Sequence, residues 1–160
     1  MSTIDKRIEE LGLVLPKVFP VPDAMSDYMA MVRIDGDRCY ISGHAPLNAD
    51  GSIAQSLGKV GADLTLEQGV AAAKATALAM LATLKNELGS LDKIKQWNRV
   101  FGMVNSAPGF DQQTPVINGF SEVISAVFGK DVGRHARSAV GMAELPFSIP
   151  VEVEAEISLH

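Results

Sequence analysis

The sequence contains a single cysteine, Cys39, and only three histidines, His44, His135 and His160. One cysteine cannot form an internal disulfide, so a reducing, cytoplasmic setting is expected. Three scattered histidines and one thiol also supply too few ligands for a Cys/His metal site. Cys39 falls inside an apolar segment and is expected to be a small buried side chain.

Long apolar runs and an excess of positive charge are also missing. No uninterrupted apolar stretch reaches the roughly 20 residues of a membrane span, because Lys74 and Lys85 interrupt the alanine-rich run. The N-terminus, MSTIDKRIEELG, lacks the basic start and apolar run of a signal peptide. The net charge is -5, which gives no general attraction to nucleic acid or to anionic membrane surfaces.

Several catalytic motifs are absent as well. The chain has no GxSxG, no glycine-rich phosphate loop, no HExxH and no CxxC. Triad hydrolases, nucleotide-binding proteins and zinc enzymes therefore have no support. What is present, 160 residues with 47% hydrophobic and 21% charged side chains, is typical of one globular domain over residues 1–160.

Residues 1–22 are expected to form a short helix and an extended connector ahead of the main fold. Ser2 or Thr3 can cap the helix and Gly12 suits its end. Three prolines between Pro16 and Pro22 favour an extended backbone.

Two predicted strands follow, near residues 30–34 and 38–42. Asp35-Gly36-Asp37 between them is a hairpin turn signal. Residues 46–61 are rich in Gly, Asn, Asp and Ser and predict a loop. Ser42-Gly43-His44 is interpreted as a turn at the end of the second strand.

Two long helices are predicted next. Thr65 and Gln68 form a capping box for the first, and Gly89 ends it. Its apolar stripe recurs at three- and four-residue steps: Leu66, Val70, Ala73, Ala77, Leu81 and Leu84. Thr114 is the predicted cap of the second helix, followed by a proline at the first helical position, with Gly129 as its stop.

A strand over about residues 95–105 separates these helices. Strict alternation predicts two faces: Trp97, Phe101 and Met103 on one, and Val100 and Val104 on the other. Two last strands are expected near residues 137–143 and 151–159. The final one alternates apolar residues with Glu152, Glu154 and Glu156.

The element order predicts an α+β, two-layer sandwich, in which two helices cover one face of a mixed sheet. A sheet face carrying Trp97, Phe101 or Met103 is too apolar for water. We therefore expect subunits to associate through the face without helices.

Arg137 and Glu152 are the main candidates for a functional site. Arg137 begins a strand among small residues, where its planar fork suits a carboxylate; the alternative is a surface salt bridge. Glu152 is either a solvated carboxylate or, if desolvated between subunits, a general acid or base with a raised pKa. His44 lacks a nearby carboxylate in the sequence that would make it a proton shuttle.

Five short segments together resemble the Rid family, also called the YjgF or reactive-intermediate deaminase family and known too as L-PSP endoribonucleases. They are Ala136–Val140 (ARSAV), Leu145–Pro146, Val151–Ala155 (VEVEA), Ile41–His44 (ISGH) and Val116–Phe120 (VINGF). The resemblance runs from about residue 28 to the C-terminus. The N-terminal extension and the segment VNSAPGF resemble a divergent subgroup.

The resemblance implies a chorismate-mutase-like fold and a homotrimer with sites in the clefts between subunits. It implies substrates that are enamines or imines of 2-oxo acids, hydrolysed to the 2-oxo acid and ammonia without a metal or organic cofactor. Binding of small carboxylate metabolites without catalysis is the alternative. RNA cleavage, suggested by the older family name, is disfavoured by the acidic charge and the missing basic–aromatic pattern.

The resemblance also implies roles for individual residues. Arg137 would bind the substrate carboxylate, and Glu152 would position or activate the water that attacks the imine carbon. Ala139 stands where the family often has cysteine: activity is kept if this position acts through its backbone N–H and is weakened if the thiol takes part. His135 stands where proline is common. Three further residues would wall or orient the ligand: Tyr28, Ser42 and Asn118.

Overall fold

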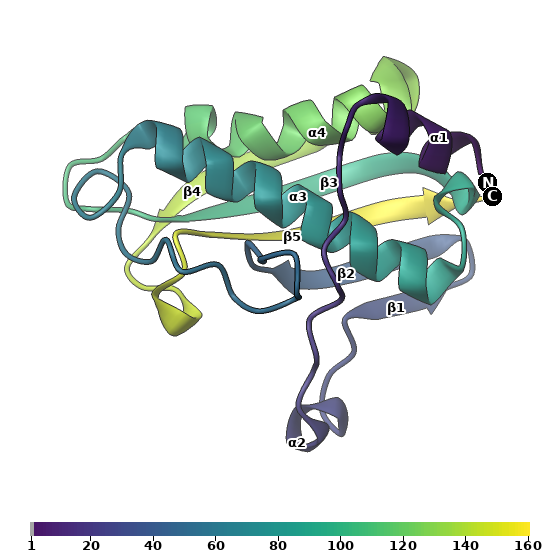
Figure 1. The fold of residues 1–160 in the computed structure, drawn as a ribbon, viewed down its shortest axis with the longest axis horizontal. Coiled ribbons are helices and arrows are strands. Elements are labelled where there is room, and N and C mark those ends of the chain that lie inside the picture. The colour runs from purple at the N-terminus through teal and green to yellow at the C-terminus, as the bar shows by residue number, and fades with distance from the viewer. Residues whose placement is uncertain (1) are drawn as a thin grey trace.

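The computed structural model describes residues 2–160, which form one mixed sheet with helices on one side (Figure 1). The strand order is β1-β2-β5-β3-β4, antiparallel except for the parallel β3–β4 pair. The strands are β1 (Val32–Asp35), β2 (Arg38–His44), β3 (Ile94–Asn105), β4 (Ala136–Met142) and β5 (Val151–Leu159). The helices are α1 (Thr3–Glu10), α2 (Asp23–Ser26), α3 (Leu66–Leu88) and α4 (Gln113–Gly133), with 3-10 turns η1 (Leu91–Lys93) and η2 (Pro146–Ser148).

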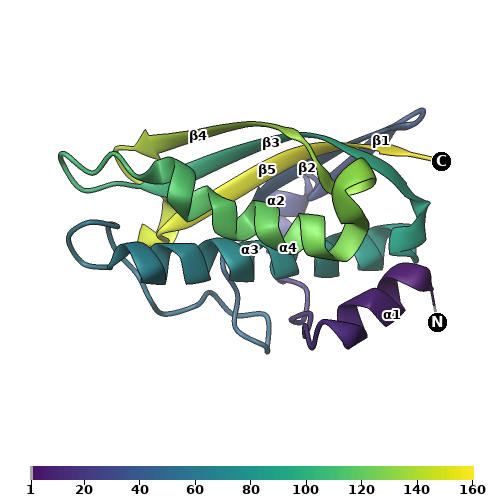
Figure 2. The ribbon, with the colours of Figure 1, turned by 90° about the horizontal axis from the view of Figure 1, so that it is seen from above.

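Figure 2 shows α3 and α4 side by side on one face of the sheet, with α1 further out. This confirms the predicted α+β sandwich with an additional N-terminal helix. No helix among residues 2–160 is long and apolar enough to cross a bilayer.

Helix α3 follows the prediction closely. Both hydrogen bonds of the Thr65–Gln68 capping box are present, and Gly89 ends the helix with φ 76°. That left-handed conformation costs a glycine little, because it has no Cβ to clash with the backbone.

Helix α4 begins earlier than predicted, so the assignment of Thr114 as its cap is wrong. The backbone N–H of Val116 donates to the carbonyl of Gln112, which places the cap at Gln112. Gln113 is held there because its side-chain amide donates to the carbonyl of Phe110 at 2.8 Å. Gly129 does break the helix, with φ 76° and ψ 172°, and a short helical segment follows it up to Gly133.

The predicted alternation of β3 fails at its start. A register shift against β5 immediately follows Trp97, so the side-chain alternation slips by one residue there. Trp97 is fully buried on the helix side with Val100, and its ring meets Phe120 edge-on at 6.1 Å. Phe101 and Met103 pack in a separate cluster on the other face.

The face without helices is consequently more polar than predicted. Glu152, Glu154 and Glu156 of β5 pair with Met103, Phe101 and Arg99 of β3, so charged and apolar side chains alternate across it. Trp97 therefore adds no apolar surface to the face without helices, and it gives no reason for subunits to associate there. Association of subunits through this face stays a prediction, because the surface is mixed and not uniformly apolar.

The N-terminal segment is fixed at the far side of the helices. Two backbone N–H groups at the start of α1, from Thr3 and Ile4, donate to the carboxylate of Asp92 at 2.8 and 2.9 Å. A negative charge at a helix N-terminus is favourable. The connector then crosses the outer surface of α3 and reaches α2 beyond β1 (Figure 1).

Candidate functional site

Arg137 lies on β4, directly opposite Val100 of β3. Because Val100 is buried beneath the helices, its neighbour Arg137 also points to the helix side of the sheet. One guanidinium nitrogen, Nη1, donates to the hydroxyl of Ser121 on α4 at 3.0 Å. Among residues 2–160 no carboxylate lies within ion-pair distance of Arg137. A salt bridge within one chain is therefore not what holds this arginine.

Ser121 connects Arg137 to His135. The Nδ1 atom of His135 lies 2.7 Å from the carbonyl of Gly133, which can only accept, so Nδ1 carries the proton. In the neutral ring Nε2 then accepts from the Ser121 hydroxyl at 2.9 Å. Burial, and to a lesser extent the charge of Arg137, lowers the pKa of His135. The chain of three side chains fixes the direction of the guanidinium.

Two predicted site residues lie near Arg137. Ala139 follows it by two residues on the same face of β4 and packs against the core. Asn118 lies one helical turn before Ser121 on α4 and is exposed. We call Arg137, Asn118 and Ala139 the arginine side of the candidate site.

Glu152 lies on the opposite face of the sheet. Its side chain passes over Gly43 of β2, where an added Cβ would lie 2.8 Å from the Glu152 Cδ. The carboxylate lines a cavity of about 340 Å³. Burial, with a smaller contribution from Glu154, raises the pKa of Glu152. The interpretation of Glu152 as a fully solvated carboxylate does not describe its position.

Ser42 belongs to the same face. Its hydroxyl donates to the carbonyl of Ala30 at 2.7 Å, and it lines a shallow pocket together with Glu154. The predicted turn at Ser42-Gly43-His44 is wrong, because β2 continues to His44 with a bulge after Ile41. We call Glu152 and Ser42 the glutamate side of the candidate site.

His44 and Tyr28 are poor candidates for direct chemistry. His44 is buried on the helix side, where Nε2 lies 2.9 Å from the hydroxyl of Thr83 on α3. Burial lowers the pKa of His44 to about 4, so the ring is neutral. Tyr28 is 90% exposed in the turn after α2 and does not line the cavity beside Glu152.

A single chain does not bring the two sides together. Arg137 pairs with Val100, and Glu152 pairs with Met103, three residues further along β3. Their strands are two spacings apart, about 10 Å, and three residues span about another 10 Å. The two side chains also point to opposite faces. A small ligand in one protomer therefore cannot contact both.

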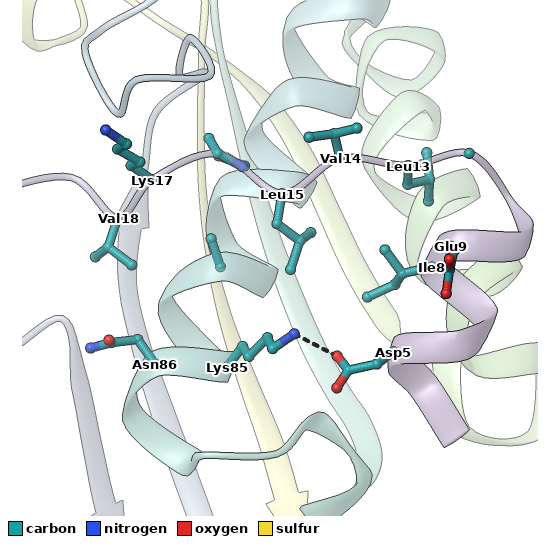
Figure 3. A pocket seen from close by; sticks show the side chains of 13 residues that line it. Asp5, Ile8, Glu9, Leu13, Val14, Leu15, Lys17, Val18, Lys85 and Asn86 are labelled. Atoms are coloured by element: carbon teal, nitrogen blue, oxygen red, sulfur yellow. Dashed lines mark ion pairs between the residues drawn. The ribbon is translucent and has the colours of Figure 1, made fainter. Parts of the chain in front are cut away.

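A cavity larger than the one beside Glu152 lies elsewhere. It is an open groove of about 880 Å³ between α1, the connector and α3 (Figure 3). Figure 3 shows the ion pair between Lys85 and Asp5, 2.8 Å long, inside this groove. It contains no residue of the candidate site. No group of three or more metal-ligating side chains occurs within residues 2–160.

The chain thus combines an α+β sandwich of this topology with an arginine at one sheet edge and a half-buried glutamate on the open face. Residues 5–152 match the family described as YjgF/chorismate_mutase-like, putative endoribonuclease. The chain belongs to this family, as the sequence resemblance predicted.

Individual proteins are similar to this chain over nearly its whole length. Protein TCP17 of Trypanosoma cruzi is 40% identical over 153 residues, covering 96% of this chain and 92% of that protein. The crystal structure of Atu1372 from Agrobacterium tumefaciens, a protein of unknown function, is 39% identical, with a TM-score of 0.87 over 98% of this chain and 92% of that one. A putative endoribonuclease from Shewanella oneidensis is 28% identical, with a TM-score of 0.89 over 99% and 100%.

Sequence reasoning overlooked two residues that set the geometry. Ser121 has no motif of its own, and its position one turn after Asn118 was the only available signal. The pattern Ser42-Gly43-His44 predicts a turn, although a glycine inside a strand pattern often marks a bulge or a close approach.

Proposed function

We propose that the protein hydrolyses the C=N bond of small 2-imino acids, or their enamine tautomers, to the 2-oxo acid and ammonia. The observation that carries the proposal is the position of Glu152, half-buried at the wall of a cavity. Burial there raises the pKa of its carboxyl group towards neutral pH. A general base works best when its pKa approaches the working pH. Arg137, which has no carboxylate partner among residues 2–160, supplies a bidentate site for the substrate carboxylate.

The reaction needs only water and these side chains. Glu152 takes a proton from water as the oxygen attacks the imine carbon, giving a tetrahedral carbinolamine. Glu152 returns this proton to the nitrogen and then moves the hydroxyl proton of the carbinolamine to the nitrogen as well. The C–N bond breaks, ammonia leaves as the C=O bond forms, and Glu152 is ionised again. Arg137 holds the carboxylate so that the reacting carbon meets the bound water with little loss of entropy.

The position of the two residues supports a site shared between copies of the chain. The arginine side of one subunit and the glutamate side of another would together complete it, in a homotrimer with three such clefts. A closed ring of this kind uses the same heterologous contact three times. Burial between subunits would desolvate Glu152 further and raise its pKa again.

Ammonia release from 2-aminoacrylate, generated enzymatically in the assay, tests the proposal. We expect the wild type to exceed the spontaneous rate at least 100-fold, and Arg137→Ala and Glu152→Ala to lose about that factor. Wild-type release at the spontaneous rate would refute deamination. If Arg137 alone were then needed for binding of pyruvate, the protein would be a carboxylate binder.

A further inference from the structure

Ser121 and His135 form a pair in which a hydroxyl faces a base. The Ser121 hydroxyl donates to Nε2 of His135 at 2.9 Å, and Nδ1–H of His135 donates to the carbonyl of Gly133 at 2.7 Å. A serine beside a histidine whose other ring nitrogen is held by a third group is the arrangement of an activated nucleophile. Such a site is defined by geometry and not by sequence position, so the absence of a GxSxG motif does not exclude it.

We propose that Ser121 is a nucleophile activated by His135 and that it accepts the acyl group of small carboxylic esters. The inference goes beyond the proposed deamination and does not depend on it, because deamination uses neither the Ser121 oxygen nor the His135 nitrogen in a chemical step. Both side chains are only partly exposed, so the acyl group that reaches them is a small one.

The reaction passes through an acyl group on Ser121. The serine oxygen bonds to the ester carbonyl carbon while its proton passes to Nε2 of His135, and the carbonyl oxygen becomes an oxyanion. The C=O bond then forms again, the bond to the alcohol oxygen breaks, and the alcohol leaves with the proton from His135. Water attacks the acyl group in the same way, with His135 first taking and then returning a proton, and the acid is released.

His135 is in the protonation state that a base needs. Burial, and to a lesser extent the charge of Arg137, lowers its pKa from 6.5, so the ring is neutral at pH 7. The carbonyl of Gly133 fixes the tautomer, and its backbone lies tight against α4, where an added Cβ would be 2.9 Å from a carbonyl oxygen. The ring also meets Phe120 edge-on at 6.5 Å. The lone pair of Nε2 is therefore held towards Ser121.

Arg137 lies where negative charge develops in this reaction. Its Nη1 donates to the Ser121 oxygen at 3.0 Å, so the carbonyl oxygen of an ester under attack comes within reach of the guanidinium. Donors that are already in place stabilise such an oxyanion without reorganisation. The hydroxyl is also accessible: Asn118, one turn earlier on α4, is exposed, and β4 is the edge strand of the sheet.

Acetylation by 4-nitrophenyl acetate tests the proposal. Absorbance follows release of 4-nitrophenolate, and mass spectrometry of peptides locates the acetyl group, which we expect on Ser121. Ser121→Ala should lower the rate about 100-fold or more. His135→Gln keeps an acceptor for the Ser121 hydroxyl but has no basic nitrogen, so a similar loss is expected. Arg137→Gln should lower the rate about 100-fold through the lost oxyanion donor.

The pH profile separates a base from a merely structural histidine. The wild-type rate should rise with pH and reach half its maximum below pH 6.5, because the pKa of His135 is lowered. His135→Gln should lose this rise while its thermal unfolding stays close to that of the wild type.

Ser125→Ala, one turn further along α4, is the matched control and should stay within about twofold of the wild-type rate. Cys39 does not compete for the reagent, because it is fully buried and burial raises the pKa of its thiol to about 11. Acetyl groups on lysines alone, or an unchanged rate in His135→Gln, would overturn the proposal. Acetylation and ammonia release are measured separately, so failure of one leaves the other standing.

Discussion

Arg137 and Glu152 lie on opposite faces of one sheet, with β3 between their strands. Arg137 is fixed from the helix side by Ser121, and Glu152 lies over Gly43 on the other side. Because neither side chain can pass through the sheet, a ligand that needs both must lie between two chains. This relationship makes the shared site testable by mixing subunits.

Mixed oligomers should recover activity that neither parent variant has. Arg137→Ala supplies an intact Glu152, and Glu152→Gln supplies an intact Arg137. Random assembly of equal amounts restores both groups at about a quarter of shared sites, from two independent chances of one half. We expect about a quarter of wild-type ammonia release after co-expression. If the mixture stays inactive while gel filtration shows mixed oligomers, the two residues do not form a shared site.

Glu152→Gln should separate activity from stability. Loss of the general base should lower kcat about 100-fold or more. Because burial raises the pKa of Glu152, its contribution to stability is complete below its unfolded pKa and is lost as the pH rises through the folded pKa. At pH 7 the variant should therefore be as stable as the wild type or more stable by about 0.5 kcal/mol, a small gain because solvent screens a half-exposed carboxylate. Urea denaturation at pH 7 measures it, with the exposed Glu9→Gln as control.

Gly43→Ala should impair the site more than the fold. The new Cβ would lie 2.8 Å from Glu152 Cδ, and a flexible side chain can move away at small cost to stability. A displaced carboxylate, however, no longer meets the substrate, so we expect kcat to fall about 10- to 100-fold. In the Glu152→Gln background the same change should have no further effect on kcat. An additional loss there would show that Gly43 acts independently of Glu152.

Ser121→Ala should weaken binding of the carboxylate. Arg137 would lose its side-chain acceptor, the Ser121 hydroxyl, and the guanidinium would lose its fixed direction. We expect KM to rise about tenfold with kcat changed less than threefold, in keeping with about 1.5 kcal/mol for a hydrogen bond to a charged group. Ser121→Thr should restore KM. Ser125→Ala, one turn further along α4, is the matched control, and an equal rise in its KM would contradict a specific role for Ser121.

His44 should make the protein sensitive to acid. Burial keeps the folded pKa at about 4, whereas the unfolded chain binds a proton near pH 6.5. Stability from this group is complete above pH 6.5 and is lost as the pH falls to about 4, by roughly 3 kcal/mol in total. Denaturation at pH 7 and pH 4.5 should show a smaller loss for His44→Gln than for the wild type. The exposed His160→Gln should lose as much as the wild type; a similar loss in His44→Gln would refute the assignment.

Much of the fold follows from short-range chemistry in the sequence. The capping box at Thr65 and the left-handed glycine at Gly89 determine α3, since both act within one helical turn. The alternation of β5 likewise assigns its faces without reference to other strands. The start of α4 could not be predicted in this way. Thr114 suggests a cap, but the side chain of Gln113 donates to the carbonyl of Phe110, and the helix begins before Thr114.

The sequence by itself determined the family, the α+β class and the identity of the two candidate residues, because those depend on local pattern and on short motifs. Only the tertiary structure decided which way they point. A bulge after Trp97 moves this residue to the helix side of β3. Strand pairing places Arg137 beside Val100 and Glu152 beside Met103, on opposite sides of the sheet. The face on which a side chain lies, and its distance from residues on other strands, depend on how strands far apart in the sequence pair. No local pattern encodes this pairing.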